Sequence, residues 1–156
     1  MKQFKFTSKM ATLIVSAAAC LAATSSQAKD YVTTPDTQAR AYSLSVSSDS
    51  PKKTIYFAGQ TGHLDADGKP ITNFDAQARR AFTLLDQTLR KSGAKLSDVV
   101  SMTVFITDVR NGKHFADIRK EFFPDGKFPG SALIAVDGLM GQSMIEIQGV
   151  AVVDGK

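Results

Sequence analysis

The chain has 156 residues, of which 43% are hydrophobic and 22% charged, and it holds one cysteine. This composition is typical of one globular domain and excludes both a disordered chain and a disulfide-rich scaffold. The formal charge of +4 includes Lys2, Lys5 and Lys9, which lie in a segment without acidic residues. Removing these three from the 19 basic residues leaves 16 against 15 acidic residues, so we do not expect nucleic acid as a partner.

Residues 1–28 have the pattern of a secretory signal peptide. The three lysines precede an apolar stretch from Met10 to Ala23, and Ser26-Gln27-Ala28 offers small residues at the two positions that a signal peptidase reads. The apolar stretch is short for a membrane span. We therefore expect cleavage after Ala28, a mature chain that begins at Lys29, and a periplasmic or secreted location. We expect no stable membrane association after the signal is removed.

Cys20 leaves a second processing route open. A lipoprotein signal also places a cysteine after small residues, here Ala17 to Ala19, although the leucine usual in such a signal is missing. Lipidation at Cys20 and cleavage after Ala28 are therefore alternatives. With cleavage the mature chain has no cysteine, which excludes thiol catalysis and disulfides.

The mature chain begins with a polar segment, residues 29–40, which we interpret as an extended N-terminal arm before a domain over 41–154. Alternation over 41–46 and strand-forming residues over 54–60 predict two strands. The turn residues between them favour a hairpin. Residues 65–68 form a turn that leads into a short strand near Pro70 and Ile71.

A helix is predicted over 75–92, because its apolar residues recur on one face, with Asn73 as the cap and Gly93 as the stop. Further elements follow in order: a strand over 101–107, a helix over 114–123, and strands over 132–136 and 144–153. This order predicts an α+β fold, a single mixed β-sheet with two helices on one face.

The other face of this sheet has no cover within the chain. It carries Val150 and Val152, opposite Ile145 and Ile147. An apolar sheet face left uncovered is an association surface, so we expect a homo-oligomer.

Familiar catalytic signatures are absent from the sequence. It contains no phosphate-binding loop ending in Lys-Ser/Thr, no HExxH and no GxSxG. His63 and His114 are the only histidines and have no clustered acids, so we predict no metal site within one chain. Nothing in the spacing favours a Ser-His-Asp triad around either histidine.

Glu146 is the most informative carboxylate, because it lies in an apolar strand where an acid costs free energy unless it is paired or exposed. It is either a solvent-face acid or a partly desolvated carboxylate that holds or activates a water. The loop 122–130 likewise either walls a pocket or caps the core. Arg119 and Lys120, like Arg79 and Arg80, are interpreted as solvated helix faces.

An ordered set of motifs resembles the Rid family (RidA/YjgF, the reactive-intermediate deaminases). The motifs extend over nearly all of residues 37–153 in the family's order and spacing. They are Tyr56-Phe57-Ala58-Gly59-Gln60, the helix from Phe74 to Gly93, Leu96-Ser97-Asp98-Val99-Val100, Thr103 to Asp108, Phe128-Pro129 and Ile145 to Val152.

The resemblance implies a chorismate-mutase-like fold, assembled as a homotrimer with ligand clefts between neighbouring subunits. It also implies hydrolysis of reactive 2-imino acids, such as 2-iminobutanoate and 2-iminopropanoate, to 2-oxo acids and ammonia. The family's activity needs no metal or cofactor, so the resemblance implies none for this chain.

The resemblance also assigns site residues. Tyr42 matches a pocket tyrosine, Gly59 matches a glycine whose backbone lines the cleft, and Glu146 matches the carboxylate associated with the attacking water. The catalytic candidates are therefore Glu146 and Tyr42. The substrate-binding candidates are Arg40, Ala58, Gly59 and Ser131.

One position departs from the family pattern. The imine deaminases carry an arginine after Phe128-Pro129-Gly130 that clamps the substrate carboxylate, and this chain has Ser131. A serine offers one neutral hydrogen bond in place of two charge-assisted ones. Arg40 and Lys127 are the two candidates to replace the clamp.

Two functions follow and remain open. The first is a Rid-like hydrolase or deaminase of small reactive metabolites with an altered substrate range, which the retained Glu146 favours. The second is a trimer that binds a small metabolite in the same clefts without turnover, which the lost arginine favours. Ribonuclease activity, a name also attached to this family, is disfavoured by the near-neutral charge of the mature chain.

Overall fold

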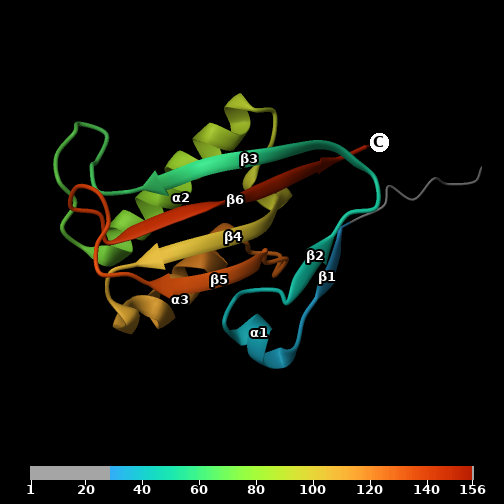
Figure 1. The fold of residues 1–156 in the computed structure, drawn as a ribbon, viewed down its shortest axis with the longest axis horizontal. Helices are drawn as coiled ribbons and strands as arrows, with labels where there is room; N and C mark the ends of the chain where they lie inside the picture. Colours follow the sequence, from blue (N-terminus) through green and yellow to red (C-terminus); the bar gives the residue numbers. More distant parts are fainter. Residues whose placement is uncertain (1–28, 156) are drawn as a thin grey trace, which may run out of the picture.

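The computed structural model describes residues 29–155, so the predicted signal peptide and Cys20 lie outside the described residues. The elements are β1 (Asp30–Val32), α1 (Pro35–Ala39), β2 (Ser45–Ser47), β3 (Pro51–Thr61), α2 (Phe74–Lys91), β4 (Val99–Ile106), α3 (Gly112–Phe122), β5 (Gly130–Ala135) and β6 (Ile145–Asp154) (Figure 1). Two 3-10 turns, Leu96–Asp98 and Val109–Asn111, precede β4 and α3. Within residues 29–155, no helix has the length and apolar character needed to cross a membrane.

The main sheet has four strands in the order β3-β6-β4-β5. Strand β6 runs antiparallel to both β3 and β4, and β5 runs parallel to β4. The parallel pair requires a crossover connection, which α3 provides. Both α2 and α3 lie on one side of the sheet (Figure 1). The predicted mixed sheet with two helices on one face is therefore confirmed.

Helix α2 supplies most of the core. The Asn73 side chain accepts a hydrogen bond from the Ala76 N–H at 3.0 Å, and Gly93 ends the helix with a φ of 75°. Both signals were predicted. The apolar face of α2 is fully buried: Ala78, Ala81, Phe82, Leu85 and Leu89. Phe82 also stacks on Phe122, with ring centroids 4.5 Å apart, which joins α2 to the end of α3.

The N-terminal segment differs from the prediction. Residues 35–39 form α1, and 45–47 form β2, which pairs with β1 in a separate two-stranded sheet. The predicted strand over 41–46 and its hairpin with 54–60 are therefore wrong. The Thr34 hydroxyl caps α1 by accepting from the Thr37 N–H, and Thr37 returns the interaction to the Thr34 backbone. This reciprocal cap fixes a helix too short to show in the apolar periodicity.

A second predicted element is reduced to a single contact. The expected short strand near Pro70 and Ile71 consists of one isolated bridge between Leu64 and Pro70. The connection from β3 to α2 is otherwise a loop, and it enters α2 at Asn73.

The two faces of the sheet differ as expected, with one exception. Ile145 and Ile147 are buried in the core, whereas Val150 pairs with Tyr56 on the face away from the helices, the open face. Tyr56 is 81% exposed, but Val152 is only 9% exposed. The exposed apolar surface of the open face is thus centred on Tyr56 and Ile134 rather than on Val152.

Candidate functional site

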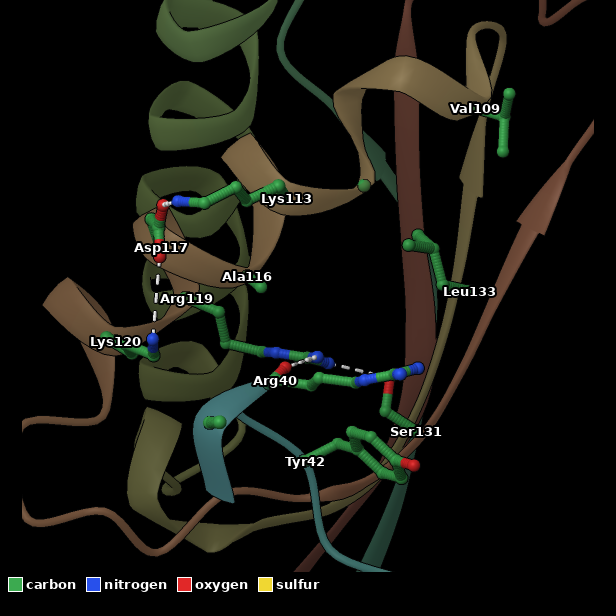
Figure 2. Close-up of a pocket in the computed structure, with 12 residues that line it drawn as sticks. Arg40, Tyr42, Val109, Lys113, Ala116, Asp117, Arg119, Lys120, Ser131 and Leu133 are labelled. Carbon is green, nitrogen blue, oxygen red and sulfur yellow. Dashed lines mark hydrogen bonds and ion pairs between the residues drawn. The ribbon is translucent and has the colours of Figure 1, made fainter. Parts of the chain in front are cut away.

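A cavity of about 720 Å³ opens between the segment after α1, helix α3 and strand β5 (Figure 2). We call it the α3–β5 pocket. Three of the predicted site residues, Arg40, Tyr42 and Ser131, line it together with Arg119 and Leu133. Residues separated by about ninety positions in sequence therefore meet here, because the segment after α1 bridges to the start of β5.

A strained turn positions Arg40 and Tyr42. Ala41 is fully buried and adopts a φ of 60°, the left-handed region that residues with a Cβ rarely occupy. The Tyr42 N–H donates to the Thr37 carbonyl at 3.0 Å, and the Ala41 N–H donates to the Gln38 carbonyl at 3.1 Å. These two bonds close α1 in a Schellman motif, at a cost of about 1–2 kcal/mol for alanine in this conformation. Such strain is typical of segments that position functional groups.

Strand β5 is fixed against this turn through Ser43. The Ser43 hydroxyl donates to the Phe128 carbonyl at 2.6 Å, and the Ser43 N–H donates to the Pro129 carbonyl at 3.0 Å. Phe128 is buried in the core, whereas Lys127 is exposed and does not line the pocket. The loop 122–130 therefore caps the core, and Lys127 lies outside the α3–β5 pocket.

Arg119 is the residue that sequence analysis misjudged. We expected a solvated side chain, but Arg119 is only 3% exposed and lies over the Phe115 ring at 4.8 Å. Its Nη1 donates to the Ser131 hydroxyl at 2.7 Å, and its Nη2 donates to the Arg40 carbonyl at 3.2 Å. The sequence did contain an indication of this burial. Arg119 follows Phe115 by four positions and precedes Phe122 by three, which places it on the apolar face of α3.

The electrostatics of this pocket depend on Arg119. Burial lowers its pKa to about 10, while the nearby Tyr42 acts in the opposite direction, so the guanidinium is charged at neutral pH. Lys113 and Lys120 both pair with Asp117, and Arg40 pairs with Asp36 at 3.3 Å. Among residues 29–155, Arg119 forms no ion pair, and its buried Nε has no hydrogen-bond partner.

Glu146 lies on the open face of the sheet, half-buried, and it pairs in register with Phe105. A Cβ on Gly59 would lie 1.7 Å from the Glu146 Oε1. Only glycine therefore allows the carboxylate to lie against β3 at this point. A register shift between Phe57 and Gln60 marks an irregularity at Gly59, and Ala58 beside it is exposed.

The predicted site is thus divided between two faces of the sheet. Ser131 pairs with Met102, which is buried under the helices, whereas Glu146 pairs with Phe105 on the opposite side. Neighbouring paired residues share a face of a sheet, and successive residues alternate. One chain therefore holds Arg40, Tyr42 and Ser131 in the α3–β5 pocket, and holds Ala58, Gly59 and Glu146 apart from them.

The described residues contain no group of three or more His, Cys, Asp or Glu side chains that could hold a metal ion. His63 contacts Thr61 and Ser143 through its Nδ1, at 3.0 and 3.3 Å. The other histidine, His114, lies 3.3 Å from an Asp75 oxygen on the surface.

The chain belongs to the family described as Endoribonuclease L-PSP, whose model matches residues 15–153. Relatives carry the names that the sequence resemblance implied. A 2-iminobutanoate/2-iminopropanoate deaminase of Dermatophagoides farinae is 31% identical over 102 residues, which are 65% of this chain and 79% of the relative. A RutC family protein of Aquifex aeolicus is 29% identical over 99 residues, 63% of this chain and 79% of the relative.

The fold has counterparts among solved structures. A protein of unknown function of the conserved Rid family, YyfB from Yersinia pestis, is similar with a TM-score of 0.71. The match covers 80% of this chain and 98% of that one, at 21% identity. The predicted membership of the Rid family and its fold are therefore confirmed.

Proposed function

We propose that this protein hydrolyses small metabolites of the 2-imino acid type in clefts between the subunits of a homotrimer. The observation that carries the proposal is the Glu146 carboxylate, which lies against Gly59 on the open face of the sheet. This pair occurs in a chain of the family whose relatives include 2-iminobutanoate/2-iminopropanoate deaminases.

The chemistry requires few groups. Water attacks the carbon of the protonated imine while Glu146 accepts a proton from it, which gives a neutral tetrahedral carbinolamine. Glu146 returns this proton to the nitrogen, and the carbon–nitrogen bond then breaks as the hydroxyl loses its proton to the Glu146 carboxylate, so that ammonia leaves and a 2-oxo acid remains. The Tyr42 hydroxyl borders the same cleft in the proposed assembly and donates a hydrogen bond to the carbinolamine oxygen.

Assembly of several copies joins the two parts of the site. Within one chain, Glu146 and Ser131 are on opposite faces of the sheet, so the carboxylate cannot reach the α3–β5 pocket. The open face exposes Tyr56 and Ile134, at 81% and 42%. Packing of this face against a neighbouring copy removes apolar surface from water and brings Glu146 of one subunit toward the pocket of the next.

A second function is supported by Ser131. Without the family's arginine on β5, the same assembly is suited to hold a small metabolite without turnover. Ammonia release separates the two functions, because a binding module releases none.

The test measures ammonia release from 2-iminobutanoate, generated in situ, by the purified protein and by Glu146→Gln. We expect the variant to lose about 10²–10⁴-fold in rate with its fold intact. Gln148→Ala, two residues along the same face of β6, is the matched control and should retain activity. Absence of ammonia release by the unmodified protein would contradict the hydrolase and leave the binding module.

We also propose that the protein is exported, with Lys29 as its first mature residue. The mass of the protein recovered from the periplasm distinguishes cleavage after Ala28 from lipidation at Cys20. A mass that still includes residues 1–28 would contradict both routes.

A further inference from the structure

Arg119 is a buried charge without a counter-charge. Burying an ionised group is costly unless it is paired. Four other arginines of the described residues form ion pairs: Arg40 with Asp36, Arg79 with Glu121, Arg90 with Asp86, and Arg110 with Asp108. Arg119 instead contacts a hydroxyl and a backbone carbonyl, both neutral. The fold thus retains a desolvated cation that no acid of residues 29–155 compensates.

The guanidinium also has unused donors. It carries five N–H groups, and its two hydrogen bonds, to Ser131 and to the Arg40 carbonyl, use two of them. The Nε–H is buried and has no partner. An anion that enters the pocket supplies the missing negative charge and accepts hydrogen bonds from the free N–H groups of Arg119.

The surroundings favour a small anion with an apolar part. Figure 2 shows Arg119 extending from α3 toward Ser131 on β5, with Tyr42 beside the serine. Ala116 and Leu133 add apolar surface to the same pocket. Lys113 and Lys120 already share Asp117, and Arg40 pairs with Asp36. Among the described residues that line this pocket, the planar guanidinium of Arg119 is therefore the only unpaired cation. The paired N–H groups of a planar guanidinium match the two oxygens of a carboxylate.

We propose that Arg119 is the carboxylate-binding group of the α3–β5 pocket, so that the anion clamp comes from α3 in this chain and not from position 131 on β5. Ser131 then supports the clamp, since its hydroxyl accepts a hydrogen bond from the Arg119 Nη1 at 2.7 Å. The ligand class is a small 2-oxo or 2-imino carboxylate. This class rests on the proposed function, but the binding itself requires no turnover.

The experiment measures binding rather than catalysis, using protein purified after expression of the full chain. The probes are 2-oxobutanoate, the uncharged 2-oxobutanamide, and inorganic phosphate, and the measurements are the dissociation constant by calorimetry and the shift in Tm. We expect 2-oxobutanoate to bind and to raise Tm, and the amide to do neither. Arg119→Met should weaken 2-oxobutanoate binding by about 10- to 100-fold.

Two further variants keep the result interpretable. Arg79→Met removes an arginine that is exposed and paired with Glu121, and it should leave binding unchanged. Arg119→Lys keeps the charge but lacks the paired N–H groups of a guanidinium, and should bind 2-oxobutanoate more weakly than the unmodified protein. Without ligand, Arg119→Met should have a Tm equal to or above that of the unmodified protein, because a buried uncompensated charge has been removed.

Several outcomes would overturn the inference. They are equal binding of the amide, tighter binding of phosphate, unchanged affinity in Arg119→Met, or failure of both Arg119 variants to fold, which would make Arg119 a structural residue. The proposed function fails differently. Arg119-dependent binding of 2-oxobutanoate without ammonia release would refute hydrolysis and leave the clamp, whereas full ammonia release by Arg119→Met would refute the clamp and leave hydrolysis.

Discussion

The two faces of the main sheet differ in how deeply their side chains are buried. On the face under α2 and α3, Met102, Val104 and Ile106 are buried, and close contacts are made by backbone as well as side chains. On the open face, Tyr56 and Ile134 are exposed, and the half-buried Glu146 lies over a glycine. The first face forms the hydrophobic core. The second exposes apolar side chains that the core does not cover, which is typical of a surface that binds a partner or ligand.

The largest expected effect on stability comes from a comparison of two glycines near one end of β3, Gly59 and Gly62. A Cβ on Gly62 would lie 1.9 Å from the Gln77 carbonyl oxygen of α2, whereas a Cβ on Gly59 would meet only the end of the Glu146 side chain. A backbone cannot move aside as a side chain can. We expect Gly62→Ala to lower the free energy of unfolding by several kcal/mol, on the order of the largest single-residue effects.

Gly59→Ala should affect activity and leave stability almost unchanged. We expect an almost unchanged midpoint in urea, with ammonia release reduced at least 10-fold because the Glu146 carboxylate is displaced from β3. Urea unfolding and the ammonia assay on both variants check this pair. Full activity in a folded Gly59→Ala would show that the position of the carboxylate against β3 is irrelevant to the reaction.

The next effect concerns assembly. If the open face is the surface between copies, charges placed on it should separate them, since burial of an unpaired charge is unfavourable. We expect Tyr56→Lys combined with Ile134→Lys to reduce the mass measured by light scattering from that of the proposed trimer to that of one chain. Met140→Lys is the control, because Met140 is 87% exposed in a loop outside the sheet. An unchanged mass in the double variant would place the interface elsewhere.

The parts of this architecture that sequence predicted are those with long apolar periodicity. Helix α2, with Asn73 as its cap and Gly93 as its end, has five fully buried residues on one face. The strand predicted over 101–107 likewise corresponds to β4, whose Met102 and Val104 are buried. Helix α1 escaped prediction because five residues held by a Thr34 cap carry no periodicity.

Sequence analysis predicted individual site residues but not how the fold arranges them. The resemblance supplied Tyr42, Gly59 and Glu146, but the division of the site depends on the register of β5 against β4, which no local pattern encodes. Arg119 lay at an apolar position of α3, and its charge outweighed that position in the prediction. The position of Arg119 on the apolar face, rather than its charge, therefore corresponds to its observed burial.

The smallest predicted effect lies at the far end of β6. Asp154 accepts hydrogen bonds from the Lys29 Nζ at 2.8 Å and from the Ser48 hydroxyl at 2.5 Å. The Lys29 ammonium, with Ser48 second, holds the pKa of Asp154 below its usual value. The unfolded chain therefore binds more protons at this residue, so its contribution to stability is complete above the unfolded pKa of about 3.9. The contribution is lost as the pH falls through the folded pKa.

We expect Asp154→Asn to reduce the free energy of unfolding by about 0.2–1 kcal/mol at pH 7, the range of ion pairs near a surface, and by less at pH 3. Urea unfolding at both pH values measures the difference. Asp137→Asn, an exposed acid beyond β5, is the control and should show no such change. An equal loss at both pH values would mean that Asp154 acts through packing. A loss confined to pH 7 would mean that its charge ties Lys29, the expected first residue of the mature chain, to the last strand.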